Sequence, residues 1–323
     1  MADPRPVIIT SGEPAGIGPE IAALSFEALG ADVPMAWIGD PSHLPPGTDF
    51  ALIDDLSQVR SGTALPVLAR DFGAPRTPGQ PNPVHAQGVV DVIAEAVALC
   101  TSGAASGLCT GPIHKAALMD GADFAYPGHT EYLAALAGDV PVVMMLACPE
   151  LRVVPVTIHI PLAKVPEQLN AAILTDTILI THAGLRQRFG LERPRIAVSG
   201  LNPHAGEDGK MGSEDQDIIA PVIDALRDKG MAITGPHSAD TLFHAAARAH
   251  YDVAICMYHD QALIPIKTLD FAGGVNVTLG LPFVRTSPDH GTAFDIAGKG
   301  KADPTSMIAA IKMAAQMAER HAG

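Results

Sequence analysis

The segment PVIITSGEPAGIGPEIAALSFEAL, residues 6–29, decides the fold class. It joins a short apolar run to a glycine-containing turn and then to a helical pattern with Pro19 in its first turn, which is typical of a strand followed by a helix. Six further apolar runs predict strands covered on both faces, at residues 35–39, 106–110, 140–146, 153–160, 195–200 and 252–258. Because helical patterns lie between such runs, the sequence predicts an α/β fold with a parallel sheet. Residues 65–83, which contain five prolines, are expected to form a surface loop.

Length and composition exclude several classes of protein. A chain of 323 residues with 47% hydrophobic content is long enough for two lobes with separate cores. The net charge of −14 argues against nucleic acid and against an anionic membrane surface as partners. The four cysteines show no CxxC spacing and are expected to be reduced thiols. The longest apolar run, residues 142–148, is far shorter than the ~20 residues that span a bilayer. A cytoplasmic protein without a membrane partner is therefore expected.

Three histidines follow predicted strands, and these are His159, His204 and His259. Ligands of open α/β sheets bind beyond the carboxyl ends of the strands, so such residues are candidates for a site. Three imidazoles would leave open positions on a divalent ion, as catalysis requires, and imidazole favours Zn, Co or Ni over Mg. A structural hydrogen bond is the alternative role for each ring. The spacing also allows a two-fold dimer to build the site from both chains.

The first turn carries Gly12, Gly16 and Gly18 before a helix, and Asp40 ends the next predicted strand. This arrangement is similar to a dinucleotide fingerprint, but the glycine spacing is G-x-x-x-G-x-G and not G-x-G-x-x-G. Either a nucleotide site or a tight turn between strand and helix would account for it.

Several longer motifs are similar to those of one enzyme family. They are GEPAGIGPEI, GPIHK (111–115), PGHTEYLA (127–134), GLNPHAGEDGKMGSED (200–215), YHDQALIPIK (258–267) and LPFVRTSPDHGTAFDIAGKGKADPTSMI (281–308). In order and over nearly the whole chain, they resemble the 4-hydroxythreonine-4-phosphate dehydrogenases of vitamin B6 synthesis. The resemblance implies an isopropylmalate dehydrogenase-like fold of two α/β/α lobes with an active-site cleft between them. One lobe would comprise residues 1–127 and 284–323 with the cofactor loop. The other would comprise residues 128–283 with the metal ligands and the dimer contact.

The resemblance also implies the members of the site. A homodimer would share each metal site, with His159 from one subunit and His204 and His259 from the other, around one Zn, Co or Mg ion. Substrate contacts would fall on His129, Thr130, Lys267, Asn276 and Arg285. NAD or NADP would bind at His290, Gly291, Thr292, Ala293 and Asp295, which makes Asp40 a weaker candidate. The proton acceptor is open among Lys267, His129, a water on the metal and Asp240, which lies in the first turn of a helix expected to be capped by Ser238.

The implied reaction is the NAD-linked oxidation of 4-phosphooxy-L-threonine at C3, followed by loss of CO₂. Its substrate carries a phosphate, and in an acidic chain Lys267 and Arg285 would supply the positive charge to bind it. The nearest alternative is a sister dehydrogenase that acts on D-threonate or D-erythronate 4-phosphate or on a cyclic diol carboxylate. A non-catalytic protein that binds metal or nucleotide is an alternative from another class.

Overall fold

The computed structural model describes residues 5–321, and the chain divides into two compact units. Unit 1 comprises the chain up to Pro141 together with the chain from Leu281 onward, and unit 2 is Val142–Gly280. The sequence-based division assigned residues 128–141 to the middle of the chain. The structure instead places helix α4 (His129–Leu136) in unit 1, because α4 packs against α2 (Ala86–Thr101). His129 and Thr130 therefore belong to the unit made from both chain ends.

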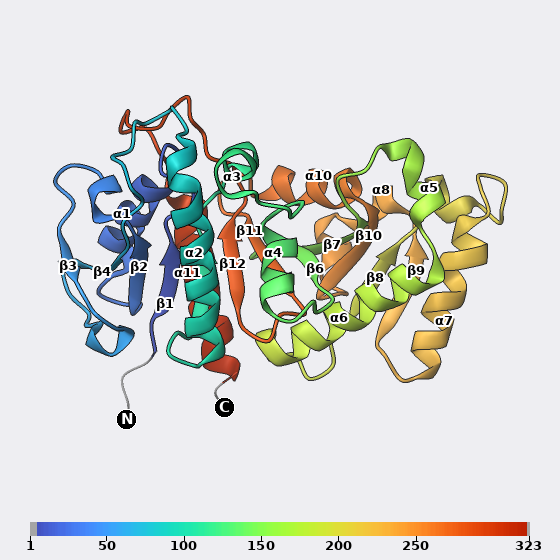
Figure 1. The fold of residues 1–323 in the computed structure, drawn as a ribbon. Coiled ribbons are helices and arrows are strands. Elements are labelled where there is room, and N and C mark those ends of the chain that lie inside the picture. The colour runs from blue at the N-terminus through green and yellow to red at the C-terminus, as the bar shows by residue number, and fades with distance from the viewer. Residues whose placement is uncertain (1–4, 322–323) are drawn as a thin grey trace. The chain divides into compact units, whose positions relative to one another are not determined.

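Unit 1 is built on six parallel strands in the order β3-β4-β2-β1-β5-β12. The strands are β1 (Val7–Thr10), β2 (Met35–Gly39), β3 (Phe50–Leu52), β4 (Leu65–Ala69), β5 (Gly107–Thr110) and β12 (Arg285–Pro288). The other helices of this unit are α1 (Gly18–Leu29), α3 (Lys115–Ala122) and α11 (Thr305–His321). Helix α2 contacts β1, β2 and β5, whereas α11 contacts β1, β5, β12 and α1. Figure 1 shows α2 in front of the sheet and α11 behind it, so both faces are covered.

Strand β4 lies in the segment that was predicted to be a surface loop, and that prediction is wrong for its first five residues. Leu65 and Val67 are fully buried, and β4 pairs with β3 and β2. Pro66 is tolerated because the pairing with β2 begins only at Val67, opposite Trp37. A proline that has no partner on that side does not need the N–H that it lacks.

Unit 2 also has six strands, in the order β11-β6-β7-β10-β8-β9. They are β6 (Val143–Cys148), β7 (Leu151–Thr157), β8 (Ile196–Ser199), β9 (Ile233–His237), β10 (Val253–Tyr258) and β11 (Val275–Leu279). The pairs β6–β7 and β6–β11 are antiparallel, while β7, β10, β8 and β9 run parallel. The parallel character that the sequence predicts is interrupted at β6–β7, because the short connection between these strands permits only a hairpin.

Helices and short helical turns connect the strands of unit 2. They are η4 (Leu162–Lys164), α5 (Val165–Gln168), α6 (Ala171–Phe189), η5 (Pro203–Gly206), η6 (Asp215–Ile219), α7 (Ala220–Asp228), α8 (Ala239–Leu242), α9 (Ala245–Arg248) and α10 (His259–Leu269). Ser238 stands at the N-cap of α8, as predicted, but its hydroxyl donates to the carboxylate of Asp240 at 2.5 Å and accepts no backbone N–H. The helix expected after it is divided into α8 and α9.

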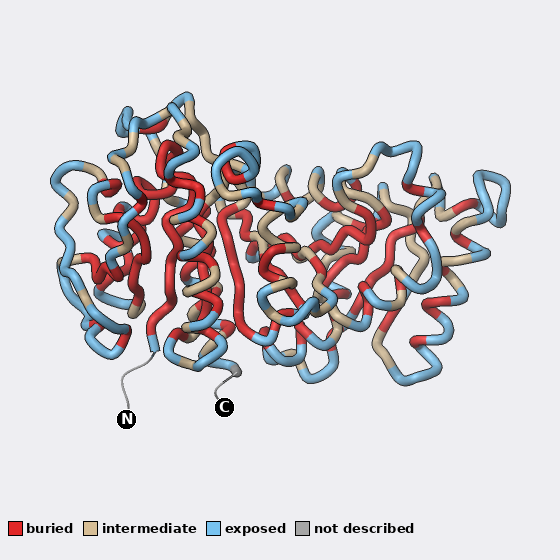
Figure 2. Tube along the Cα trace, in the orientation of Figure 1, coloured by how far each residue is buried: buried red, intermediate tan, exposed pale blue. Residues whose placement is uncertain are grey.

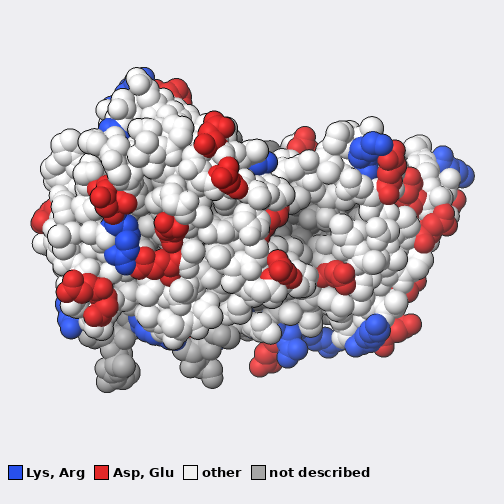
Figure 3. Space-filling view, in the orientation of Figure 1, with Lys and Arg blue, Asp and Glu red and all other residues white. Residues whose placement is uncertain are grey.

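All seven predicted strands are present, and they form the buried centre of each unit (Figure 2). The four cysteines are free, as predicted, and all four are buried. Residues Pro83–Thr101 are long and apolar enough to cross a membrane by length and composition alone. Most of this segment is α2, which packs one face on the sheet of unit 1. On the face drawn in Figure 3, acidic and basic residues are interspersed and no continuous basic stripe is visible.

Candidate active site

The carboxyl ends of three neighbouring parallel strands in unit 2 carry the three histidines. Strand β10 lies between β7 and β8, with Tyr258 opposite Thr157 and Ile255 opposite Val198. His159 follows β7 by two residues, and His259 is the first residue of α10 directly after β10. His204 lies in η5, five residues beyond the end of β8. The order of the strands thus brings all three segments to one edge of the sheet.

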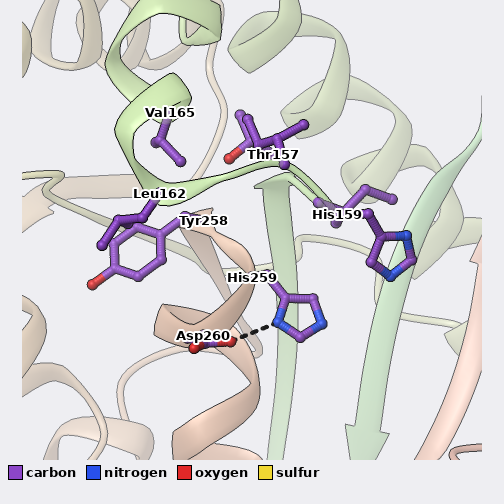
Figure 4. A pocket seen from close by; sticks show the side chains of 9 residues that line it. Thr157, His159, Leu162, Val165, Tyr258, His259 and Asp260 are labelled. Carbon is purple, nitrogen blue, oxygen red and sulfur yellow. Dashed lines mark hydrogen bonds and ion pairs between the residues drawn. The ribbon is translucent and has the colours of Figure 1, made fainter.

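His159 and His259 line the same cavity of ≈ 360 Å³. Their ring centroids are 5.7 Å apart, and Figure 4 shows the two rings side by side, with Tyr258 on the other side of His259. The Nδ1 atom of His259 is 2.7 Å from Oδ1 of Asp260. A carboxylate at this nitrogen fixes the orientation of the imidazole and directs Nε2 toward a ligand, as it does in many metal sites.

His204 is exposed and does not line this cavity. Its backbone φ of 52° lies in the left-handed region, as do those of Ala205 and Glu207, so the loop is strained. The buried carboxylate of Asp215 holds the start of this loop, because it accepts the N–H groups of Leu201 at 2.8 Å and Asn202 at 3.1 Å. Among residues 5–321, no three His, Cys, Asp or Glu side chains of one chain gather where they could hold a metal ion.

This arrangement fits a divalent metal ion only in part within one chain. Two imidazoles that face one cavity, one of them oriented by a carboxylate, are suitable donors for Zn or Co. A third histidine would have to come from the η5 loop, from this chain or from another copy. The donor set is therefore chemically suitable but not complete in one chain.

Unit 1 holds a buried cation at the start of β12. Arg285 is only 3% exposed, and its Nη2 donates to Oγ1 of Thr110 at 2.7 Å. Burial lowers the pKa of Arg285 to about 10, so it remains charged at neutral pH. Burial, and next the charge of Arg285, hold the pKa of His129 well below 6.5. His129 is therefore a neutral imidazole beside a cation, and its buried Nε2 has no hydrogen-bond partner in the described part of the chain.

The remaining substrate contacts that the sequence predicts are dispersed. Lys267 is half-buried on α10, with Nζ 5.3 Å from the centre of the Phe271 ring. Asn276 is half-buried on β11, and its Oδ1 has no partner within residues 5–321. Asp240 is exposed on α8, which contacts the η5 segment that carries His204. Thr130 is half-buried in the first turn of α4.

The predicted cofactor residues lie in the loop after β12, which is fastened to the start of α1. The carbonyl of Thr292 accepts the N–H of Ile17 at 3.0 Å. Gly16 allows this approach, because a Cβ at that position would stand 2.7 Å from the same carbonyl oxygen. His290 has a buried Nε2 that no other described residue contacts by a hydrogen bond.

The rest of the loop also exposes groups that could face a ligand. Gly291 and Asp295 are exposed, and Ala293 adopts a φ of 46°. Such a loop, with accessible backbone and an unsatisfied ring nitrogen, fits a bound nucleotide. By contrast, Asp40 is used by the fold, because its carboxylate accepts the backbone N–H groups of Ser42 at 2.9 Å and Phe72 at 3.1 Å.

Sequence reasoning missed four residues that support these groups, namely Asp260, Thr110, Asp215 and Gln261. Asp260 and Gln261 belong to the YHDQ motif, Asp215 ends the GLNPHAGEDGKMGSED motif, and Thr110 ends a predicted strand. Their places beside the histidines or at strand ends were available signals. The hydrogen bonds of Gln261 to Gly200 and of Thr110 to Arg285 depend on which strands are neighbours, and that was not predicted.

Comparison with known proteins gives one family. The model of the family described as pyridoxal phosphate biosynthetic protein PdxA matches residues 35–314. The 4-hydroxythreonine-4-phosphate dehydrogenase of Roseobacter denitrificans is 64% identical over 98% of each chain. A crystal structure of the enzyme of that name from Klebsiella pneumoniae superposes with a TM-score of 0.90 at 39% identity, over 98% of this chain and 99% of that one. A terephthalate 1,2-cis-dihydrodioldehydrogenase from Burkholderia xenovorans gives 0.67 at 26% identity, over 97% and 98%. These matches confirm the predicted α/β fold class.

Proposed function

Since the chain belongs to the family of the pyridoxal phosphate biosynthetic protein PdxA, we propose that it is a 4-hydroxythreonine-4-phosphate dehydrogenase of vitamin B6 synthesis. It would oxidise 4-phosphooxy-L-threonine at C3 with NAD⁺, giving 2-amino-3-oxo-4-phosphooxybutanoate. Loss of CO₂ from this β-keto acid would then yield 3-amino-1-hydroxyacetone 1-phosphate. The observation that carries the proposal is the 64% identity over 98% of the chain to an enzyme of that name.

Arg285 would bind the substrate phosphate. A guanidinium that is 3% exposed is costly to bury, and a doubly charged anion would repay that cost through charge-assisted hydrogen bonds. His129 would add a neutral donor, because its pKa is held well below 6.5 by burial and by Arg285. Thr130, Lys267 and Asn276 are further proposed contacts.

His159, His204 and His259 would hold one divalent ion, Zn, Co or Mg, with Asp260 orienting His259. Such an ion supplies Lewis-acid stabilisation of negative charge on the substrate oxygen. The proton of the C3 hydroxyl needs an acceptor, and Lys267, Asp240 and His129 are the candidates on this chain. Burial and the charge of Arg285 hold the pKa of His129 well below 6.5, which keeps the ring neutral but weakens it as a base, so this favours Lys267 or Asp240 over His129.

NAD, or NADP, would bind along the loop of His290, Gly291, Thr292, Ala293 and Asp295, and it supplies the hydride acceptor. The His290 Nε2 atom would find its hydrogen-bond partner in this ligand. We also propose a cytoplasmic homodimer that shares its metal sites. A histidine from a second copy would complete the donor set, since no three such side chains gather within residues 5–321 of one chain.

A steady-state assay tests the substrate. The rate with 4-phosphooxy-L-threonine and NAD⁺ is compared with the rates for D-threonate 4-phosphate and D-erythronate 4-phosphate. We expect kcat/KM to be highest for the amino acid, and a preference of more than tenfold for a sugar acid would overturn the assignment.

A second candidate is a dehydrogenase of cyclic diol carboxylates. The observation that favours this second candidate is the similarity of the chain to a terephthalate dihydrodiol dehydrogenase, at 26% identity and a TM-score of 0.67. Terephthalate dihydrodiol carries no phosphate, so adding it to the same assay separates the two candidates. Its turnover should be undetectable if Arg285 binds phosphate.

A further inference from the structure

Strands β10 and β8, which lead to His259 and His204, are no longer paired at their carboxyl ends. The register between β10 and β8 runs as far as Ile255 opposite Val198. Two residues further along both strands, Met257 would stand opposite Gly200, but no pairing is formed there. On the other side of β10 the ladder continues to Tyr258 opposite Thr157. Strand β8 therefore diverges from β10 at the level of the histidines, whereas β7 does not.

The carboxamide of Gln261 fills the gap where the ladder stops. Its Oε1 accepts the N–H of Met257 at 2.7 Å, and its Nε2 donates to the carbonyl of Gly200 at 2.8 Å. Gln261 is only 8% exposed, so both hydrogen bonds are shielded from water. One side chain thus links two strands at a position where they form no direct backbone pairing. The size of its carboxamide sets the distance between them.

This bridge belongs to a set of buried and partly buried hydrogen bonds across the three strand ends. The hydroxyl of Thr157 donates to the carbonyl of Met257 at 2.8 Å, which ties β7 to β10. Beyond Gly200, the carboxylate of Asp215 accepts the N–H of Leu201 at 2.8 Å. The backbone that carries each predicted metal ligand is therefore fixed to its neighbour, and Gln261 is the link across the diverging pair.

Helix capping does not account for Gln261. It is the third residue of α10, where a glutamine can bond the N–H of the N-cap residue, but its Oε1 instead accepts the N–H of Met257, which belongs to β10. The bond from Nε2 to Gly200 serves no need of the helix, because Gly200 follows another strand.

We propose that Gln261 is a positioning residue for the metal site, because it sets the distance between the segments that carry His259 and His204. This inference rests on the proposed function, which assigns those histidines as metal ligands. Supporting groups around metal ligands typically alter metal affinity about 10- to 100-fold when they are removed. We expect a loss of this size when the bridge to Gly200 is broken.

The test uses Co²⁺ as the probe, in the full-length protein, with three variants. Gln261→Glu keeps the oxygen that accepts the N–H of Met257 but removes the donor to Gly200, and its negative charge would by itself attract the cation. Gln261→Met removes both hydrogen bonds at similar length. Tyr251→Phe is the matched control, because it removes a buried hydrogen bond, to the carbonyl of Leu242 at 3.0 Å, just before the amino end of β10.

Calorimetric titration gives the Co²⁺ affinity, and the visible absorption of Co²⁺ reports the geometry of its ligands. Both Gln261 variants should bind Co²⁺ about 10- to 100-fold more weakly than wild type, with a changed spectrum. Tyr251→Phe should match the wild type in both measurements, although the melting temperatures of the metal-free variants fall by a similar ~2–4 °C. If Gln261→Met does not fold, the Gln261→Glu variant still decides.

Two results would overturn the inference. Affinities within twofold of wild type and an unchanged spectrum in Gln261→Glu would mean that the bond to Gly200 does not position the metal ligands. Failure of the wild type to bind Co²⁺ would remove the metal site itself and the positioning role with it. Binding of Co²⁺ without turnover of 4-phosphooxy-L-threonine would instead refute the proposed substrate and leave the positioning role standing.

Discussion

Replacing Arg285 with methionine should make the ligand-free protein more stable while it weakens substrate binding. Arg285 is 3% exposed, and burial lowers its pKa from 12.5 to about 10. At 1.36 kcal/mol for each tenfold change in proton affinity, the folded chain bears a cost of about 3 kcal/mol for holding this charge. Loss of its hydrogen bonds, one of which goes to Thr110, offsets about 1 kcal/mol of the gain.

The net expectation is a gain of about 2 kcal/mol in the free energy of unfolding, which is roughly 4–8 °C in melting temperature for a unit of this size. Binding should change in the opposite direction. A charge-assisted hydrogen bond contributes about 1.5–3 kcal/mol, so KM for the phosphorylated substrate should rise roughly 10- to 100-fold. Arg285 would then lower the stability of the ligand-free protein while it strengthens substrate binding.

Thermal melts without ligand and steady-state kinetics measure the two effects. Arg188→Met is the matched control, since Arg188 is also buried, at 7% exposed, but lies on α6 outside the predicted site. Its KM should stay at the wild-type value. A lower melting temperature for Arg285→Met than for wild type would refute the argument, because it would show that the guanidinium stabilises the fold before any anion binds.

Three further predictions concern the cofactor loop, acid stability and the metal. Gly16→Ala places a Cβ 2.7 Å from the carbonyl oxygen of Thr292, so KM for NAD should rise more than KM for the substrate, and equal rises would contradict this. Burial lowers the pKa of His43 below 6.5, so the unfolded chain binds the extra proton and the free energy of unfolding should fall as the pH is lowered from about 7 to 5. His43→Gln should reduce that slope in denaturant titrations, and an unchanged slope would assign it to other groups. Dialysis against a chelator should abolish turnover and added Co²⁺ or Zn²⁺ should restore it, whereas full activity after chelation would exclude the metal.

The seven strands could be predicted because each is a largely apolar run. Such a run shows little alternation between apolar and polar residues when both faces of the strand are buried. Strand β12 could not be predicted in this way, since its residues Arg285–Pro288 are mostly polar although all are buried. Their polar atoms find partners inside the fold, as when the Thr286 hydroxyl donates to the carbonyl of Ala310 at 2.9 Å. Hydropathy alone cannot reveal such pairing, because it depends on elements far away in the sequence.

For the candidate site, the sequence identified residues but not the distances between them. Spacing after strands identified His159, His204 and His259, and the structure places all three segments at one edge of the unit 2 sheet. The distances were not predictable, because they depend on the sheet order β7-β10-β8 and on where the β10–β8 ladder stops. Side chains that act between strands, such as Gln261, become visible only when that order is known.

Unit 1 is formed by two separate stretches of the chain, and this affects how the protein folds during synthesis on the ribosome. Unit 2 is one continuous stretch, Val142–Gly280, and can fold as soon as it has emerged. Unit 1 must wait, because β12 and α11 are synthesised after unit 2 and β5 has no neighbour on one side until β12 arrives. A nascent chain that stalls after Gly280 would thus carry an unfinished sheet with an open, apolar edge, which is a target for chaperones and for aggregation.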